Sequence, residues 1–140
     1  MRRLLLLSMF MLGACAKTPG AAVQVADAWS PLAPPGATTV AIYADISASH
    51  ADSLTSISTP LAASAQLHAS VEENGMMKMR AVPQLDLKEG ETVHLSPGGM
   101  HVMLMGVQQP LAVDASIPLV FHFARAGDIA VTARVRAAER

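Results

Sequence analysis

Cysteine, aromatic residues and excess charge are all scarce in this sequence. Cys15 is the only cysteine among 140 residues, so the chain cannot close an internal disulfide. Aromatic residues make up 4%, and 10 Lys and Arg stand against 11 Asp and Glu. Without a basic excess we expect no nucleic-acid partner. The main apolar run, Leu4 to Leu12, is too short to span a bilayer as a helix.

The N-terminal segment predicts export and lipidation. Arg2 and Arg3 precede the apolar run, which ends in Leu12-Gly13-Ala14-Cys15, a sequence typical of a lipobox. A lipid on Cys15 would hold the protein to a membrane of the periplasm without spanning it. It would also leave no thiolate for catalysis or for a blue-copper site. The alternative is an ordinary signal peptide with an incidental cysteine. The predicted segments are a lipoprotein-type signal peptide over 1–14, a tether over 15–22 and one β-domain over 23–137.

Short stretches of period-2 or apolar character recur between turn residues along the rest of the chain. Stretches this short and this evenly spaced predict an all-β sandwich or small barrel. Pro60–Ala65 has room for one helical turn. The predicted strands are Val23–Trp29, Thr39–Ser47, Leu54–Thr59, Ala65–Val71, Met76–Val82, Thr92–Leu95, His101–Met105, Leu119–Ala124 and Ile129–Val135.

Methionine is concentrated in one part of the sequence. Three of the nine Met lie in the leader, and the other six fall between residues 76 and 105. Methionine used as core filler would be scattered along the chain. His68, Met79, His101 and Met103 follow the pattern His-x10-Met-x21-His-x-Met. Thioether sulfur binds Cu(I) well and Mg, Ca or Zn poorly, so these four residues predict a Cu(I) site.

A predicted hairpin would bring these ligands toward one another. Asn74-Gly75 favours a type I′ turn, which pairs His68 with Ala81 and Ser70 with Met79. His68 and Met79 are then diagonal neighbours on one face, and His101 and Met103 share a face of a third strand. The Pro97-Gly98-Gly99 turn would aim that strand. The same alternation puts Met77 and Met105 beside the predicted ligands, at the rim of the site or in a second shell, with direct binding as the alternative. It turns Met76 and Met100 to the opposite face for packing.

The other polar residues offer weaker alternatives. His50, His94 and His122 could form a zinc site, but their spacing in the sequence matches no zinc-ligand pattern. We interpret His50 and His94 as surface residues and His122 as exposed or hydrogen-bonded. An enzyme would need a positioned acid or base beside an open metal position. Glu72 and Glu73 lie at the predicted hairpin tip, where a solvated turn explains them. We therefore expect no catalytic residue.

At these residues the chain resembles the periplasmic copper chaperone family often called PCuAC. The four-residue pattern is that family's copper motif, and similarity extends from about Val23 to Val135. Ala69 is a departure, because many members carry Met or another polar residue after the first His. Ser30-Pro31 is another, because many members carry an Arg shortly after the Trp. The similar segments include Asp27-Ala28-Trp29, Ala41-Ile42-Tyr43, Met77-Lys78-Met79-Arg80 and the run from Pro97 to Gly106.

The resemblance implies a cupredoxin-like Greek-key β-barrel that carries Cu(I) and is not an enzyme. It implies transfer to cytochrome c oxidase subunit II, where the binuclear copper centre lies, or to a thioredoxin-fold copper protein. We expect a monomer, and we expect Cu(I) affinity to fall below about pH 6.5, because a ligating imidazole must be neutral. Two alternatives stay open. One is copper storage or detoxification, which a transfer assay would separate from delivery. The other is a metal-free envelope interaction module, for which His68→Ala and Met103→Ala would leave function intact.

Overall fold

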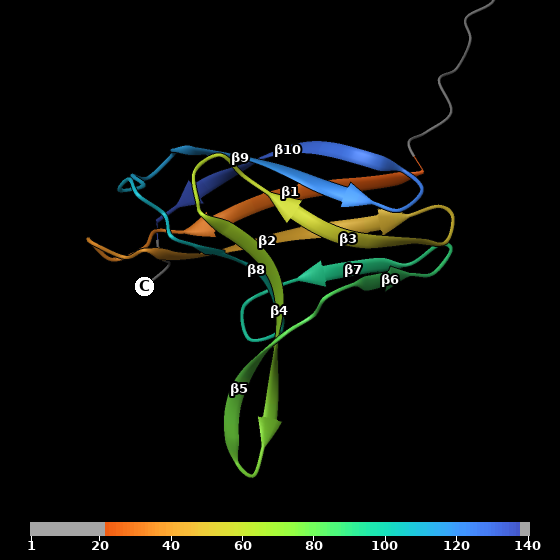
Figure 1. The fold of residues 1–140 in the computed structure, drawn as a ribbon, viewed down its shortest axis with the longest axis horizontal. Coiled ribbons are helices and arrows are strands. Elements are labelled where there is room, and N and C mark those ends of the chain that lie inside the picture. The colour runs from red at the N-terminus through yellow and green to blue at the C-terminus, as the bar shows by residue number, and fades with distance from the viewer. Residues whose placement is uncertain (1–21, 138–140) are drawn as a thin grey trace, which may run out of the picture.

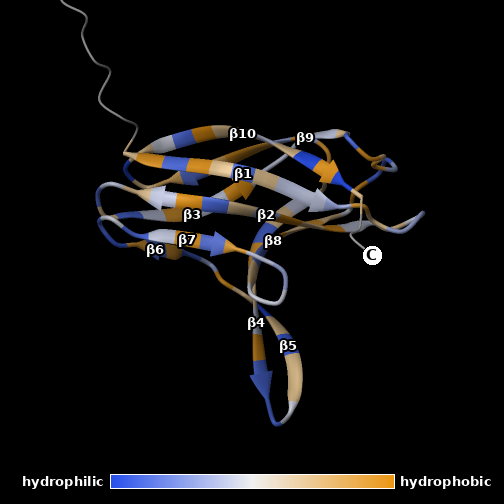
Figure 2. Ribbon diagram, turned by 180° about the vertical axis from the view of Figure 1, so that it is seen from behind, coloured by the Kyte–Doolittle hydropathy of each residue, from blue (hydrophilic) through white to orange (hydrophobic). Residues whose placement is uncertain are grey.

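Alternating burial along the strands builds the core of the protein. The computed structural model describes residues 22–137, so the predicted signal peptide and Cys15 lie outside the described part. Along β2 (Thr39–Ala48) every second residue, from Val40 to Ala48, is buried. Figure 2 shows the same alternation of hydrophobic and hydrophilic residues along the strands. Within residues 22–137 no helix has the length and apolar character needed to cross a membrane.

Ten strands form one mixed sheet that curls into an open barrel (Figure 1). Their order is β5-β4-β8-β2-β1-β10-β9-β3-β6, and β7 also pairs with β2. Only β1 and β10 pair in parallel among the described strands. The strands other than β2 are β1 (Val23–Pro31), β3 (Asp52–Ser58), β4 (Ser64–Glu73), β5 (Met76–Ala81), β6 (Leu85–Leu87), β7 (Thr92–Leu95), β8 (Met100–Met105), β9 (Ser116–Phe123) and β10 (Gly127–Arg136).

The predicted all-β class is confirmed, and all nine predicted strands are present. Their ends differ by up to three residues, as where Leu119 was the predicted start and β9 begins at Ser116. The tenth strand, β6, was missed because its three residues carry no readable period. Pro60 to Ala63 form turns, and the following residues already belong to β4, so the helical turn that the sequence allowed there is absent from this segment.

The β4–β5 hairpin has the predicted turn and register. Asn74 and Gly75 have φ angles of 52° and 76°, as a type I′ turn requires. His68 pairs with Ala81, and Ser70 pairs with Met79. The hairpin extends away from the body of the barrel, as Figure 1 shows.

A closed loop between β7 and β8 directs β8 toward the hairpin. Both strands pair with β2, on consecutive stretches of its length. The loop is held by hydrogen bonds from Ser96 N to Met100 O (2.9 Å) and from Gly99 N to Ser96 O (3.0 Å). Gly98 has a φ of 80°, which favours glycine. The loop leaves β8 free to pair with β4 on its other side.

Asp52 joins the start of β3 to the β9–β10 turn. It is 8% exposed and accepts hydrogen bonds from the backbone N–H groups of Ser53 (2.7 Å), Arg125 (2.8 Å) and Ala126 (2.8 Å). Burial acts to raise the pKa of Asp52. The three N–H donors and the charge of Arg125 outweigh burial and hold that pKa below its usual value.

Replacing Asp52 by Ala is expected to lower the free energy of unfolding by about 2–4 kcal/mol, because three backbone donors lose a charged acceptor. Since the folded pKa is depressed, this stabilisation is complete above the ordinary Asp pKa of about 3.9 and is lost as the pH falls through the lower folded value. Urea unfolding at pH 7 and at acidic pH measures both effects. Asp86→Ala, which removes an exposed carboxylate with side-chain partners only, should cost less. Equal losses in the two variants would contradict this role for Asp52.

Candidate metal centre

The predicted ligands of β8 lie on the outer face of the sheet. Val102 and Leu104 are fully buried in the core, so His101 and Met103 point the other way. β4 pairs with β8 so that His68 stands opposite His101. The two imidazole ring centroids are 6.0 Å apart with an interplanar angle of 73°. β8 is thus hydrogen-bonded directly to β4 of the hairpin.

The hairpin adds thioethers to the same face. Met79 stands opposite Ser70, one step along the face from His68, and is 61% exposed. Met103 and Met105 are half-buried on β8, and Met77 lies beyond Met79 toward the hairpin tip. The structure therefore places all six residues predicted as ligands or second-shell candidates on one continuous face.

The two methionines predicted to pack on the opposite face differ. Met100 is half-buried against the core, as predicted. Met76 is 62% exposed, so its predicted packing role is wrong. The reason is that the hairpin leaves the barrel before Met76, and no core lies beneath that side of it (Figure 1).

Hydrogen bonds assign the tautomers of both candidate histidines. His101 Nδ1 lies 3.3 Å from the Gly99 carbonyl oxygen, and His68 Nε2 lies 3.2 Å from Gln66 Oε1. An oxygen of this kind only accepts, so each of these ring nitrogens must donate. In a neutral imidazole the lone pair then sits on His68 Nδ1 and on His101 Nε2. Both atoms are buried and have no hydrogen-bond partner among residues 22–137.

Two unpartnered buried nitrogens fit a metal ion. A buried polar atom without a partner is costly, and native structures carry few of them. A ligating histidine usually donates its other N–H to a carbonyl or carboxylate, which is the arrangement that Gly99 and Gln66 provide here. Residues 22–137 hold no group of three or more His, Cys, Asp or Glu suited to a metal. The same face also carries the thioethers of Met79 and Met103, and thioether sulfur favours a soft ion over zinc or calcium.

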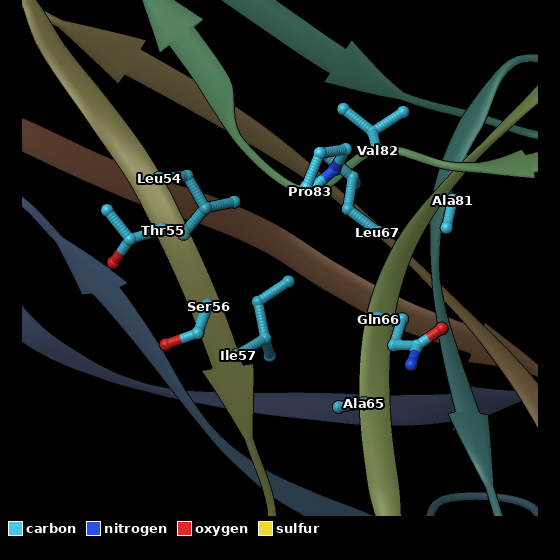
Figure 3. Close-up of a pocket in the computed structure, with 10 residues that line it drawn as sticks. All are labelled: Leu54, Thr55, Ser56, Ile57, Ala65, Gln66, Leu67, Ala81, Val82 and Pro83. Carbon is cyan, nitrogen blue, oxygen red and sulfur yellow. The ribbon is translucent and has the colours of Figure 1, made fainter.

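Sequence reasoning missed Gln66, although a signal was present. Gln66 is two residues before His68, so period 2 puts both on one face. Gln66 also borders a cavity of about 300 Å³ at the seam where β3 faces β4 without a backbone ladder. Figure 3 shows Leu54 and Ile57 extending from β3 toward β4, while Gln66 extends away from β3. The apolar seam and the candidate metal centre therefore lie on opposite sides of β4.

Aromatic rings continue the row of imidazoles across the sheet. The Tyr43 ring centroid is 6.4 Å from that of His101 and 4.9 Å from that of Trp29. The Arg136 guanidinium lies 5.1 Å from the Trp29 ring centroid. Burial raises the pKa of Tyr43, so the phenol beside His101 is neutral at physiological pH. These contacts join strands far apart in sequence, and no local pattern could have revealed them.

Of the three remaining histidines, His50 is exposed, as predicted, and the other two form surface pairs. His94 Nδ1 lies 2.6 Å from Asp45 Oδ1 and is exposed, as predicted. His122 Nδ1 lies 2.7 Å from Asp128 Oδ1, and its Nε2 lies 2.9 Å from Ser58 Oγ. This is the connectivity of a hydrolase triad, but a catalytic aspartate is buried, and the Asp128 side chain is 71% exposed. We interpret these hydrogen bonds as links between exposed polar side chains of β3, β9 and β10.

Comparison with solved structures assigns the fold. The copper-bound PCuAC domain from PmoF2 superposes with a TM-score of 0.71 at 20% identity, covering 84% of this chain and 94% of that one. The solution structure of Cu(I)-DR1885 from Deinococcus radiodurans gives a TM-score of 0.66 at 28% identity, covering 88% and 83%. The apo form of DR1885 gives 0.64 at 27% identity, covering 99% and 95%. The protein thus has an all-β, cupredoxin-like Greek-key fold, as predicted.

Comparison of sequences assigns the family. The family described as "Putative lipoprotein LpqE-like" matches residues 23–135, and the chain belongs to it. "Putative lipoprotein Lxx21020" of Leifsonia xyli subsp. xyli is 36% identical over 118 residues, which are 80% of this chain and 70% of that protein. The matched residues cover the described β-domain from β1 to β10.

Proposed function

We propose that this protein is a copper carrier of the cell envelope that binds Cu(I) through His68, Met79, His101 and Met103. The observation that carries the proposal is the pair of buried, unpartnered nitrogens, His68 Nδ1 and His101 Nε2, on a face that also bears thioethers. Copper-bound relatives of the same fold support it. The bound ion would be cargo, held by two neutral nitrogens and two neutral sulfurs.

Delivery is favoured over storage by the exposure of the candidate ligands. His101 is 4% exposed and anchors the centre on the barrel, whereas Met79 is 61% exposed on the projecting hairpin. An acceptor thiolate can therefore displace the outer ligand first. Neutral thioethers also release Cu(I) without taking up a proton.

The family and the leader support a setting in the cell envelope. A lipid on Cys15 would tether the carrier in the periplasm, in keeping with a lipoprotein family. The acceptor we propose is cytochrome c oxidase subunit II or a thioredoxin-fold copper protein, since both offer thiolates, which bind Cu(I) more strongly than thioethers do. We propose that the carrier works as a monomer and has no catalytic residue.

Anaerobic Cu(I) titration of the purified protein against a chromogenic chelator tests the proposal. We expect one tight equivalent, and an affinity lower by on the order of 100-fold in a Met79→Leu/Met103→Leu variant, because leucine keeps volume but removes the sulfur donors. The matched control is Met76→Leu/Met100→Leu, which removes the same number of thioethers from the opposite face. Wild-type affinity in the first variant, or equal losses in both, would sink the assignment of the ligands.

A further inference from the structure

The two faces of the β4–β5 hairpin have different chemistry. On one face Glu73 forms ion pairs with Lys78 (3.1 Å) and with Arg80. On the other face Met79 and Met77 follow Ala81 along β5, and Ala81 stands opposite His68. Ion-paired side chains therefore occupy the back of the hairpin. Its front carries the two thioethers, with Glu72 opposite Met77.

Met77 is the most exposed large hydrophobic side chain among residues 22–137. It is 64% exposed, whereas the large hydrophobic residues exposed elsewhere in residues 22–137, Leu32 and Val113, reach only 40% and 44%. Burial cannot explain an apolar side chain in this position, because the hairpin stands clear of the barrel (Figure 1). What the position offers is access from solvent and from another protein.

Spacing puts the sulfur of Met77 within reach of an ion held by Met79. The two residues are separated by one position on the same face, so their Cα atoms are about 7 Å apart. Methionine has three rotatable bonds, which lets both sulfurs turn toward a common point. The barrel ligands lack such access, since His101 is 4% exposed and Met103 is half-buried.

We propose that Met77 is the exit ligand for Cu(I), meaning the side chain that binds the ion last before it passes to an acceptor. This inference rests on the proposed function. In the exchange a bond forms between Cu(I) and the Met77 sulfur, and the bond to a barrel ligand, Met103 or His101, breaks. All donors are neutral, so no electron or proton moves and copper stays Cu(I). The ligands that have not left still hold the ion, which is now bound at the exposed hairpin by Met77 and Met79 as well. An acceptor thiolate can replace these ligands one at a time.

Kinetics separate an exit ligand from a resident one. The variant is Met77→Leu, and the control is Met76→Leu, which removes a neighbouring thioether of equal exposure from the opposite face. The probe acceptor is a small carrier protein displaying one Cys-x-x-Cys peptide. Stopped-flow absorbance follows Cu(I) transfer to it, and chelator competition measures equilibrium affinity.

We expect Met77→Leu to slow Cu(I) transfer on the order of 10-fold and to keep the wild-type equilibrium affinity. Met76→Leu should keep both the wild-type transfer rate and the wild-type affinity. Substoichiometric Ag(I) should broaden the ¹³C-methyl signal of Met77 but not that of Met76. Wild-type transfer by Met77→Leu would overturn the inference. An affinity loss as large as that of Met79→Leu would also overturn it, because Met77 would then be a resident ligand. Failure of the wild-type protein to bind Cu(I) would refute the proposed function itself, and the titration reveals it before any transfer is measured.

Discussion

Replacing His101 by Ala is expected to abolish tight Cu(I) binding, with a fall in affinity on the order of 100-fold or more. His101 is the most deeply placed of the four proposed ligands, and its Nε2 is held in the acceptor tautomer by the bond from Nδ1 to the Gly99 carbonyl. Alanine removes the nitrogen, and the neighbouring Tyr43 phenol cannot replace it, because burial raises its pKa and keeps it neutral. Chelator competition under anaerobic conditions measures the loss.

His94→Ala is the matched control for this experiment. His94 is also a strand histidine with a hydrogen-bonded Nδ1, but its partner is Asp45 on the β2–β7 surface. We expect this variant to keep wild-type affinity. Circular dichroism would check that both variants remain folded. Tight binding by folded His101→Ala protein would show that the unpartnered nitrogens do not mark the copper site.

Replacing Phe121 by Ala is expected to lower the free energy of unfolding by about 3–5 kcal/mol. Phe121 is fully buried on β9 and is the largest of the fully buried side chains in the described domain. A cavity of that size removes a large share of the roughly 5–15 kcal/mol that stabilises a typical domain. Urea unfolding monitored by circular dichroism measures the change.

Val120→Ala provides the comparison for Phe121→Ala within the same strand. Val120 is half-buried and points to the opposite face, so its truncation leaves the core intact. We expect a much smaller loss from it. Similar losses in the two variants would mean that β9 does not contribute to the core through the face that carries Phe121.

Local patterns predicted most of the fold because they act over a few residues. Alternation along β2 reflects a strand with one buried face, and it can be read directly. Asn74-Gly75 determined both the turn and the register of the hairpin, since positive φ at two successive positions allows one kind of turn. The three residues of β6 were missed because so short a strand shows no period and exists only through its pairing with β3.

The candidate site was predictable in its residues but not in its surroundings. Residue type and spacing singled out the His-x10-Met-x21-His-x-Met pattern, and the hairpin register put His68 and Met79 on one face. The contact of Tyr43 with His101 joins two strands through long-range pairing, which no spacing encodes. Met76 was predicted wrongly for a related reason, because alternation tells which side a residue faces but not whether a core lies on that side.

The sequence by itself determined the strands, the hairpin turn and the soft donor set, because propensity, turn geometry and ligand chemistry are properties of individual residues and their near neighbours. Only the tertiary structure decided that β8 pairs with β4, which brings the ring centroids of His68 and His101 to 6.0 Å from each other. It alone also decided that their outward nitrogens lack partners while the hairpin methionines stand in solvent. These properties depend on which distant strands meet and where the barrel ends, and both follow from packing of the whole chain.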